Sequence, residues 1–131
     1  MKYTDDRGTI EDIHYGIQFI TSKKDSERAN HWHKNSGHRA ILTKGSMEYF
    51  ERPGGSQERP TRVVFNAPAV FDTQANQEHC MYFTEDSDFV CIRIGGSETQ
   101  DRYEDDLVRL GYSLKEEYDG WEDGRYELGT Q

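Results

Sequence analysis

Four of the five histidines in this sequence lie at spacings that could place their imidazoles around one metal ion. His31, Trp32 and His33 are consecutive, His38 follows after four further residues, and His79 comes much later in the chain. Successive side chains of a β-strand point to opposite faces, so His31 and His33 share one face and Trp32 takes the other. Neutral imidazole is a common metal ligand. The spacing therefore predicts a metal site formed by His31, His33, His38 and His79.

The alternative is that these histidines are strand-surface residues, or acid and base groups that need no metal. A lone histidine would favour that interpretation, because imidazole titrates near neutral pH and suits proton transfer. Four histidines at this spacing favour the metal, and His14 is left without a special role. All-nitrogen ligation suits zinc, iron, nickel or manganese, so it does not name the divalent ion.

Further polar residues are expected near the mouth of the same site. Arg39, Glu48 and Tyr49 are the candidate catalytic residues, and Gln74 and Asn76 are expected nearby. Glu48 and Tyr49 are neighbours, so regular alternation lets only one of them face inward. A β-bulge would reverse the parity, so the sequence does not say which one does. Each could equally be an ordinary strand residue.

The elements that must position these residues are short strands. β-like runs bounded by turn residues dominate from about residue 15 to residue 95. Many short strands without helical periodicity predict an all-β sandwich or barrel. The predicted strands are Tyr15–Ser22, Arg28–His33, Arg39–Thr43, Ser46–Glu51, Arg62–Phe65, Val70–Thr73, His79–Thr84 and Phe89–Ile94.

The length of 131 residues fits a single globular unit with an extension. Residues 1–96 are predicted to form the barrel, with its core at about 15–95, and residues 97–131 an acidic C-terminal extension that contains aromatic residues. Residues 101–110 could form a short helix or an extended arm, since their periodicity decides for neither. The aromatic residues beyond residue 111 could pack on a neighbouring subunit; they are Tyr112, Tyr118, Trp121 and Tyr126.

Charge and composition exclude several partner classes. The net charge of −9, without a basic cluster, makes nucleic acid an unfavourable partner, although a small anion could still bind through local arginines or a cation. No apolar run approaches the ~18 residues of a membrane span, and the N-terminus lacks the apolar core of a signal peptide. We therefore expect a cytoplasmic protein without a membrane partner. Cys80 and Cys91 are predicted to be buried, reduced thiols.

The histidine spacing resembles the first signature of the cupin superfamily, H-x-H-x(3,4)-E-x(6)-G, with His38 in the glutamate position and Gly45 at the end. The run from Gln74 to His79 resembles the second signature, P-x-G-x-x-H, with Asn76 in place of glycine. Asn tolerates a left-handed turn better than most residues. Residues 7–13, 20–24, 28–34, 86–89 and 103–109 are similar to small single-domain cupins of sugar-nucleotide and surface-polysaccharide pathways.

This resemblance implies a jelly-roll barrel, the double-stranded β-helix of cupins, that binds a metal and acts on a small molecule. The implied function is that of a sugar or sugar-nucleotide isomerase or epimerase, in a homodimer, with an iron-dependent dioxygenase or a non-catalytic ligand-binding cupin as alternatives. The stretch around His31 and His33 is also similar to sugar-nucleotide 3,4-ketoisomerases, in which two histidines move protons without a metal. With His38 in place of a glutamate, the bound ion would carry more net charge and favour an anionic substrate.

Overall fold

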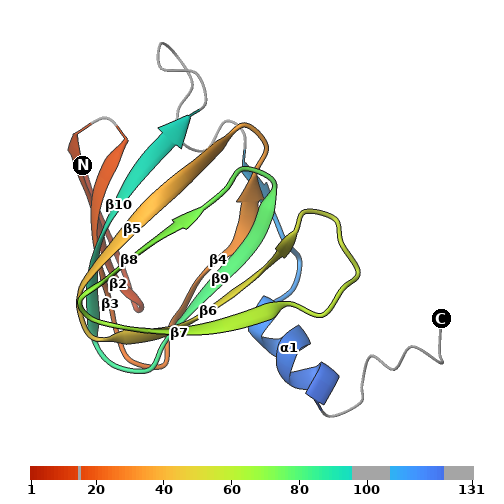
Figure 1. The fold of residues 1–131 in the computed structure, drawn as a ribbon. Coiled ribbons are helices and arrows are strands. Elements are labelled where there is room, and N and C mark those ends of the chain that lie inside the picture. Colours follow the sequence, from red (N-terminus) through yellow and green to blue (C-terminus); the bar gives the residue numbers. More distant parts are fainter. Residues whose placement is uncertain (15, 96–106, 123–131) are drawn as a thin grey trace.

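The computed structural model describes residues 1–14, 16–95 and 107–122, and its strands form two antiparallel sheets that face each other (Figure 1). The first sheet has six strands, in the order β1 (Lys2–Asp5), β2 (Gly8–His14), β3 (Ile17–Ser22), β10 (Ser87–Gly95), β5 (Ser36–Lys44) and β8 (Ala69–Thr73). The second sheet has five strands, in the order β11 (Leu107–Arg109), β4 (Glu27–His33), β9 (Gln77–Phe83), β6 (Ser46–Pro53) and β7 (Thr61–Asn66). The prediction of an all-β fold is confirmed.

Each predicted strand corresponds to an observed one, but their starts differ at the functional end. β5 begins at Ser36 rather than Arg39, so His38 lies within the strand. Tyr15, the predicted start of the first strand, lies outside the described residues, and β3 begins at Ile17. The hairpin of β1 and β2 was not predicted, because its polar, largely exposed residues lack an alternating apolar pattern.

The core between the two sheets is built from the inward positions of each strand. Leu42, Met47, Phe83 and Phe89 are completely buried there, and the Phe83 and Phe89 rings stack across the two sheets with centroids 5.7 Å apart. Cys91 is a buried member of the same core and forms no disulfide, as predicted. This apolar packing holds the two sheets at a fixed separation, and hence fixes the side chains that point into the space between them.

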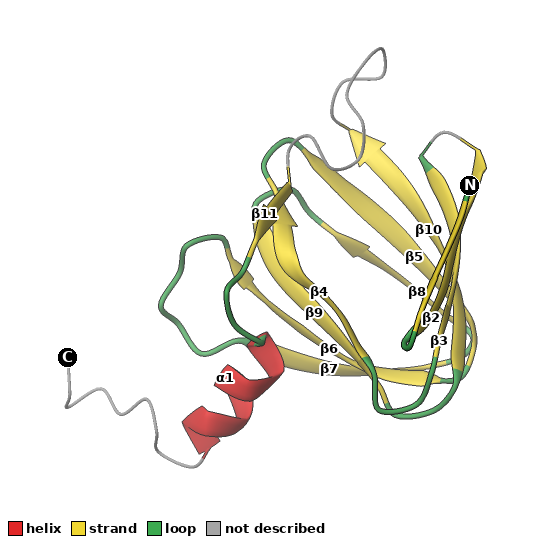
Figure 2. Cartoon of the chain, turned by 180° about the vertical axis from the view of Figure 1, so that it is seen from behind, coloured by secondary structure: helices red, strands yellow, loops and turns green. Residues whose placement is uncertain are grey.

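The C-terminal segment, residues 107–122, adds β11 to the five-stranded sheet and packs a helix on the outer face of that sheet (Figure 2). Helix α1 (Leu114–Glu122) follows Ser113, whose hydroxyl accepts a hydrogen bond from the Glu116 amide at 3.1 Å and caps the helix. Leu114 is completely buried against Phe50 and Cys80, which also forms no disulfide. The predicted boundary at residue 96 and the predicted arm residues 101–106 lie outside the described residues, as does Tyr126.

A buried ion-pair network fastens this segment to the barrel. The Arg52 guanidinium, 5% exposed, donates to Glu78 at 2.8 Å and to Glu117 of α1 at 3.1 Å. The Tyr112 hydroxyl donates to the same Glu78 carboxylate at 3.1 Å. Because each charged group has partners, the buried pair is electrostatically satisfied, and losing one partner would leave a charge uncompensated. The helix therefore docks through both apolar and ionic contacts.

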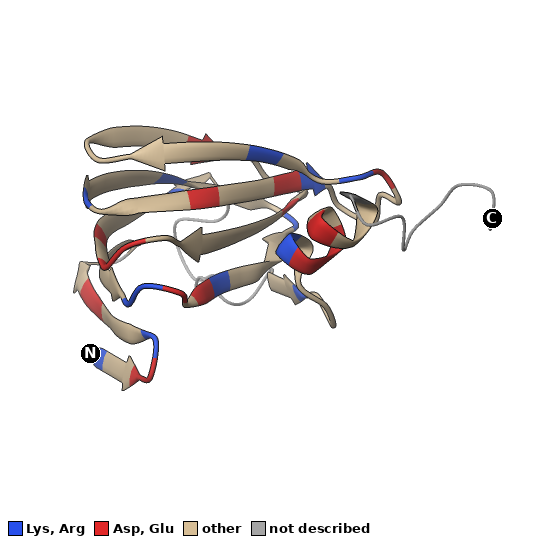
Figure 3. Cartoon of the chain, turned by 90° about the horizontal axis from the view of Figure 1, so that it is seen from below, with Lys and Arg blue, Asp and Glu red and all other residues tan. Residues whose placement is uncertain are grey.

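Acidic and basic positions are interspersed along the strands and α1 in the view of Figure 3. The sequence carries 25 acidic against 16 basic residues.

Helix α1 has nine residues, and the described part of the chain contains no helix with the length and apolar character of a membrane span.

Truncating Leu114 tests the docking of α1. Leu114→Ala should lower the free energy of unfolding by about 2–5 kcal/mol, because it leaves a cavity against Phe50 and Cys80. Urea denaturation measures the loss, and Val70→Ala, at a side chain that is 61% exposed, should change stability by less than about 1 kcal/mol. Equal effects of the two substitutions would mean that α1 does not stabilise the barrel.

Candidate metal and ligand site

The four histidines predicted as ligands lie together inside the barrel. His31 and His33 come from β4, His79 from β9 and His38 from β5 of the opposite sheet. Ring centroids are 5.0 Å apart for His31 and His33, 4.7 Å for His31 and His79, 4.9 Å for His38 and His79, and 6.4 Å for His33 and His38. Two imidazoles on one ion, at about 2.1 Å each, have centroids roughly 4.5–6.5 Å apart. The ring separations therefore suit a shared ion.

The ring orientations do not yet form a closed coordination set. In residues 1–14, 16–95 and 107–122, no three His, Cys, Asp or Glu side chains have their donor atoms arranged as a metal centre. Since the ring separations are already suitable, completing such a centre requires rotation of the imidazoles about their side-chain torsions. The fold gathers four imidazoles at one place, and their ability to share an ion depends on these rotations.

His79 has the hydrogen-bonding pattern of a metal ligand. Its side chain is 1% exposed, and Nδ1 lies 3.0 Å from the Gln77 carbonyl oxygen. A carbonyl only accepts, so Nδ1 carries the proton and Nε2 presents a lone pair. That Nε2 is buried without a hydrogen-bond partner, and so is Nδ1 of His31. A backbone carbonyl that fixes the tautomer of a ligating histidine is typical of metal sites.

Burial keeps these imidazoles neutral. Loss of hydration lowers the pKa of His31 to about 2, of His38 to about 3 and of His79 to about 4, and neighbouring histidines lower the values for His31 and His38 further. Neutral imidazole is the form that binds a metal. At neutral pH these three imidazoles therefore need no deprotonation before an ion can bind.

A β-bulge in β4 determines which side chains accompany the histidines. Ala29 pairs with Cys80, His31 pairs with His79, and Asn30 is the extra residue between them. Ala29 and Asn30 both have left-handed backbones, with φ of 73° and 56°. Regular alternation would place residues three apart on opposite faces, but the bulge lets Arg28 and His31 line the same interior cavity. The sequence analysis missed Arg28 for this reason.

Two turns tie the histidine strands together. Asn76 has a φ of 65°, which confirms the left-handed turn expected there, and its amide donates to the His33 carbonyl at 2.7 Å. Gly45 has a φ of 91°, and a Cβ at this position would lie 2.1 Å from the Ser87 hydroxyl. Only glycine fits at the Gly45 turn. Both residues of the cupin-like signatures thus have structural roles beside the histidines.

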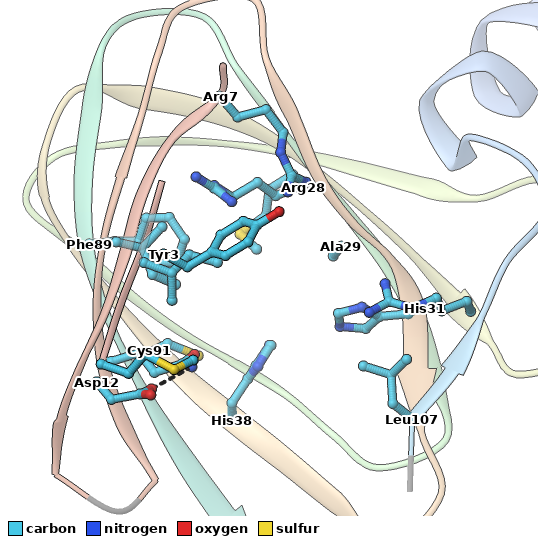
Figure 4. Close-up of a pocket in the computed structure, with 16 residues that line it drawn as sticks. Tyr3, Arg7, Asp12, Arg28, Ala29, His31, His38, Phe89, Cys91 and Leu107 are labelled. Atoms are coloured by element: carbon cyan, nitrogen blue, oxygen red, sulfur yellow. Dashed lines mark hydrogen bonds between the residues drawn. The ribbon is translucent and has the colours of Figure 1, made fainter. Parts of the chain in front are cut away.

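A cavity of about 480 Å³ opens beside the histidine cluster (Figure 4). His31 and His38 form part of its wall, and Arg7, Arg28 and Arg109 contribute positive charge. In Figure 4, Arg7 and Arg28 lie at one end of the cavity, with His31 and His38 toward the other. Apolar side chains fill much of the remaining wall; they include Ile10, Ile20, Met81, Phe89, Cys91 and Leu107. Apolar walls with a few charged groups are typical of small-molecule sites.

The structure places the candidate catalytic residues outside the cavity wall. Arg39 and Asp72 form an exposed ion pair at 2.8 Å between β5 and β8, and the Glu48 carboxylate accepts from Arg62 Nε at 3.2 Å on the outer side of β6. Met47 and Tyr49 both face the core, so the parity of β6 puts Glu48 outside. This placement follows from two strands that have no bulge at these positions.

Of Glu48 and Tyr49, Tyr49 is the residue that faces the core, and it packs beside the histidine cluster. Its ring stacks near His79, with centroids 6.4 Å apart, and its hydroxyl contacts Thr73 and lies 2.9 Å from the Glu51 carboxylate. Burial raises the pKa of Tyr49 far above its ordinary value, so the phenol stays protonated.

No family model matches the sequence, and no curated protein matches it. Solved structures do match. CapF with an inhibitor, 3-isopropenyl-tropolone, aligns with 86% of this chain and 34% of its own length, at a TM-score of 0.69 and 17% identity. CapF from Staphylococcus aureus, a capsular polysaccharide assembling protein, aligns with 84% of this chain and 31% of its own length, at a TM-score of 0.67 and 17% identity. The chain spans about a third of these longer proteins.

Two further matches have the same architecture. A mutant of Bacillus subtilis oxalate decarboxylase aligns with 84% of this chain and 30% of its own length, at a TM-score of 0.64 and 16% identity. Drosophila melanogaster CENP-C bound to CAL1 aligns with 71% of this chain and 78% of its own length, at a TM-score of 0.58 and 12% identity. At these identities the likeness concerns the fold, which is the cupin jelly roll, as expected from the resemblance.

Metal-free protein should lose stability as the pH falls below about 6.5. The unfolded chain takes up protons on its histidines there, whereas the folded pKa of His79 is about 4. Between these values the unfolded state binds more protons, so each such histidine lowers the free energy of unfolding by about 1.4 kcal/mol per pH unit. Thermal unfolding of chelator-treated protein between about pH 7.5 and pH 5 measures this slope.

The control for this slope is a variant that lacks one buried imidazole. His38→Gln should unfold with a shallower dependence on pH, and His14→Gln, at an exposed position, should keep the wild-type slope. If all three proteins share one slope, the buried histidines do not govern the acid response.

Proposed function

We propose that this cupin-fold chain binds one divalent transition metal through His31, His33, His38 and His79, and acts on a sugar or sugar nucleotide as an isomerase or epimerase. The observation that carries the metal is the buried, unpartnered Nε2 of His79, whose tautomer is fixed by the Gln77 carbonyl. Burying the lone pair of a ring nitrogen without a hydrogen-bond donor costs free energy, so packing alone does not favour this arrangement. A bound cation would satisfy it.

A bound ion would polarise the oxygens of a substrate and acidify the adjacent C–H bond. The residues of the chain would provide neutral imidazoles that can bind the ion, and the apolar walls of the cavity would exclude water beside them. Imidazoles that bind the ion have no lone pair left for a proton, so among the described residues of the cavity wall the carboxylate of Asp12 is the group placed to take or give one. Tyr49, with its raised pKa, is unsuited to act as a base.

The sugar assignment rests on the sequence resemblance and on one structural neighbour. That neighbour, CapF, is a capsular polysaccharide assembling protein, and this chain covers only 31% of it. The cavity of about 480 Å³ lies within the range of roughly 300–1,000 Å³ usual for small-molecule ligands. A small polar ligand that reaches the histidines is therefore consistent with both the dimensions and the lining. The homodimer expected from the sequence stays a prediction.

A second candidate is a cupin that binds a small molecule without turnover. The observation in its favour is that Arg39 and Glu48, two of the candidate catalytic residues, form ion pairs on the outside of the barrel. Tyr49, the third, lies behind the histidines rather than in the cavity wall. With the histidines engaged as ligands, the acid and base roles would fall on Asp12 among the described residues of the wall, and a site of this kind can serve binding without catalysis.

Metal titration tests the proposed ligands. Chelator-treated protein should bind one equivalent of zinc, nickel, manganese or iron(II), measured by calorimetry and elemental analysis. His79→Ala should weaken binding by about 100-fold or more, because the anchored donor is lost. His31→Ala should do the same, and His14→Ala should bind like the wild type. Stoichiometric binding that survives both ligand substitutions would disprove this coordination set.

Deuterium exchange separates the enzyme from the binding protein. Metal-loaded protein incubated with sugar nucleotides in D₂O should incorporate deuterium at a carbon next to a carbonyl or an anomeric centre, and NMR detects this. Saturable binding without exchange or product would support the non-catalytic candidate. Product formation only with oxygen uptake would indicate the dioxygenase alternative instead.

A further inference from the structure

Arg28 is a buried cation at one end of the cavity, and the residues that the structure describes give it no carboxylate hydrogen-bond partner. Its side chain is 5% exposed. Its Nε donates to the Ser22 hydroxyl at 2.7 Å and its Nη2 to the Thr21 carbonyl at 3.1 Å. Both acceptors are neutral, so they orient the guanidinium without balancing its charge. A guanidinium has five N–H donors, so the two hydrogen bonds leave further donors that a ligand could use.

A second arginine lies beside it. Burial lowers the pKa of Arg28 to about 10, and Arg7 is close enough for its positive charge to contribute to that shift. Arg7 pairs with Asp5, whose carboxylate accepts from Arg7 Nε at 3.0 Å and from Nη2 at 2.6 Å. One carboxylate thus faces two guanidinium groups, and the pair retains a net positive charge. Two like charges held together in a partly buried cavity are unfavourable unless an anion joins them.

The charged side chains of the cavity wall carry a net positive charge, whereas the chain as a whole is negatively charged. Its wall carries Arg7, Arg28 and Arg109 against one carboxylate, Asp12, which is engaged by the Gln18 amide at 3.0 Å. The chain as a whole has a formal charge of −9. A positive cavity in an acidic protein concentrates small anions locally and focuses their approach.

We propose that Arg28 and Arg7 form an oxyanion-binding subsite, which holds a phosphate or carboxylate group of the ligand while the rest of that ligand extends toward His31 and His38. Guanidinium groups suit both oxyanions, because their N–H donors match the spacing of the oxygens. Arg28 acts as the fixed donor, locked by Ser22 and Thr21, and Arg7 as the more exposed one. This inference rests on the proposed function in one respect: it adds that the ligand carries an anionic group. The subsite itself forms without a metal.

Binding of inorganic phosphate to chelator-treated protein tests the subsite separately from the metal. At low ionic strength, calorimetry should give saturable binding of one phosphate per chain, and added salt should weaken it. Acetate and malonate in parallel titrations decide whether the oxyanion is a phosphate or a carboxylate. If none of the three anions binds to metal-free protein, the subsite is refuted; if they bind only after metal is added, the anion contacts the ion and the proposed metal site stands without this subsite.

Substitutions locate the anion. Arg28→Gln should weaken its binding by about tenfold or more, whereas Arg39→Gln removes the same charge from an exposed position outside the cavity and should leave binding unchanged. Because Arg28 is buried, circular dichroism must show that its variant is folded. Should it fail to fold, Arg7→Gln, at a side chain that is 39% exposed, decides the question and should also weaken binding. Equal affinities of the Arg7 and Arg39 variants would overturn the proposal.

Discussion

One extra residue in β4 determines which side chains of this strand line the barrel interior. Asn30 interrupts the alternation between Arg28 and His31, and both side chains therefore line the same cavity. Without the bulge, a strand that kept the two histidines inward would turn Arg28 to the outside. The bulge thus brings the buried arginine onto the face of the strand that carries the histidines. Bulges next to functional sites commonly redirect a side chain in this way.

The bulge is held by the C-terminal segment. Left-handed backbone at Ala29 and Asn30 costs on the order of 1–3 kcal/mol for each residue, so it persists only where its surroundings fix it. The Asn30 carbonyl accepts from the Leu110 amide at 2.9 Å, and its side-chain oxygen accepts from the Leu114 amide at 2.9 Å. Leu114 is itself buried against the barrel. The residues after the barrel therefore belong to the support of the site, since they stabilise the conformation that exposes Arg28 to the cavity.

The sequence predicts the histidine cluster well because its signal is local. A two-residue period places His31 and His33 on one face, and the turn residues Gly45 and Asn76 have the left-handed backbone that their types favour. The same reasoning did not include the arginines of the cavity wall. Arg28 lines the cavity because of a bulge at Ala29 and Asn30. This bulge could not be predicted from the sequence, since alanine is an unusual residue for a left-handed backbone.

Non-local packing also escaped the sequence analysis. Arg7 reaches the cavity from the turn between β1 and β2, two strands whose polar composition gave no apolar alternation. Arg109 reaches it because β11 pairs with β4 from more than seventy positions away, in register with His31. Strand pairing of this kind depends on the closed arrangement of two sheets rather than on any property of residues 107–109 alone. Local pattern therefore identified the histidine cluster, while topology determined the charges around it.

Those charges favour a neutral histidine cluster. The positive charge of Arg109 lowers the pKa of His31 further, beyond the effects of burial and of the other histidines. The same positive charges would oppose a cation at the cluster, since like charges repel strongly where the surroundings are poorly hydrated. An oxyanion between the arginines and the histidines removes this conflict, because it attracts both the guanidinium groups and the ion. Metal and anion should therefore bind with positive coupling, each raising the affinity for the other by the same factor. On this argument the barrel is built for a ligand that carries its own negative charge, and the arginines are the part of the site that selects it.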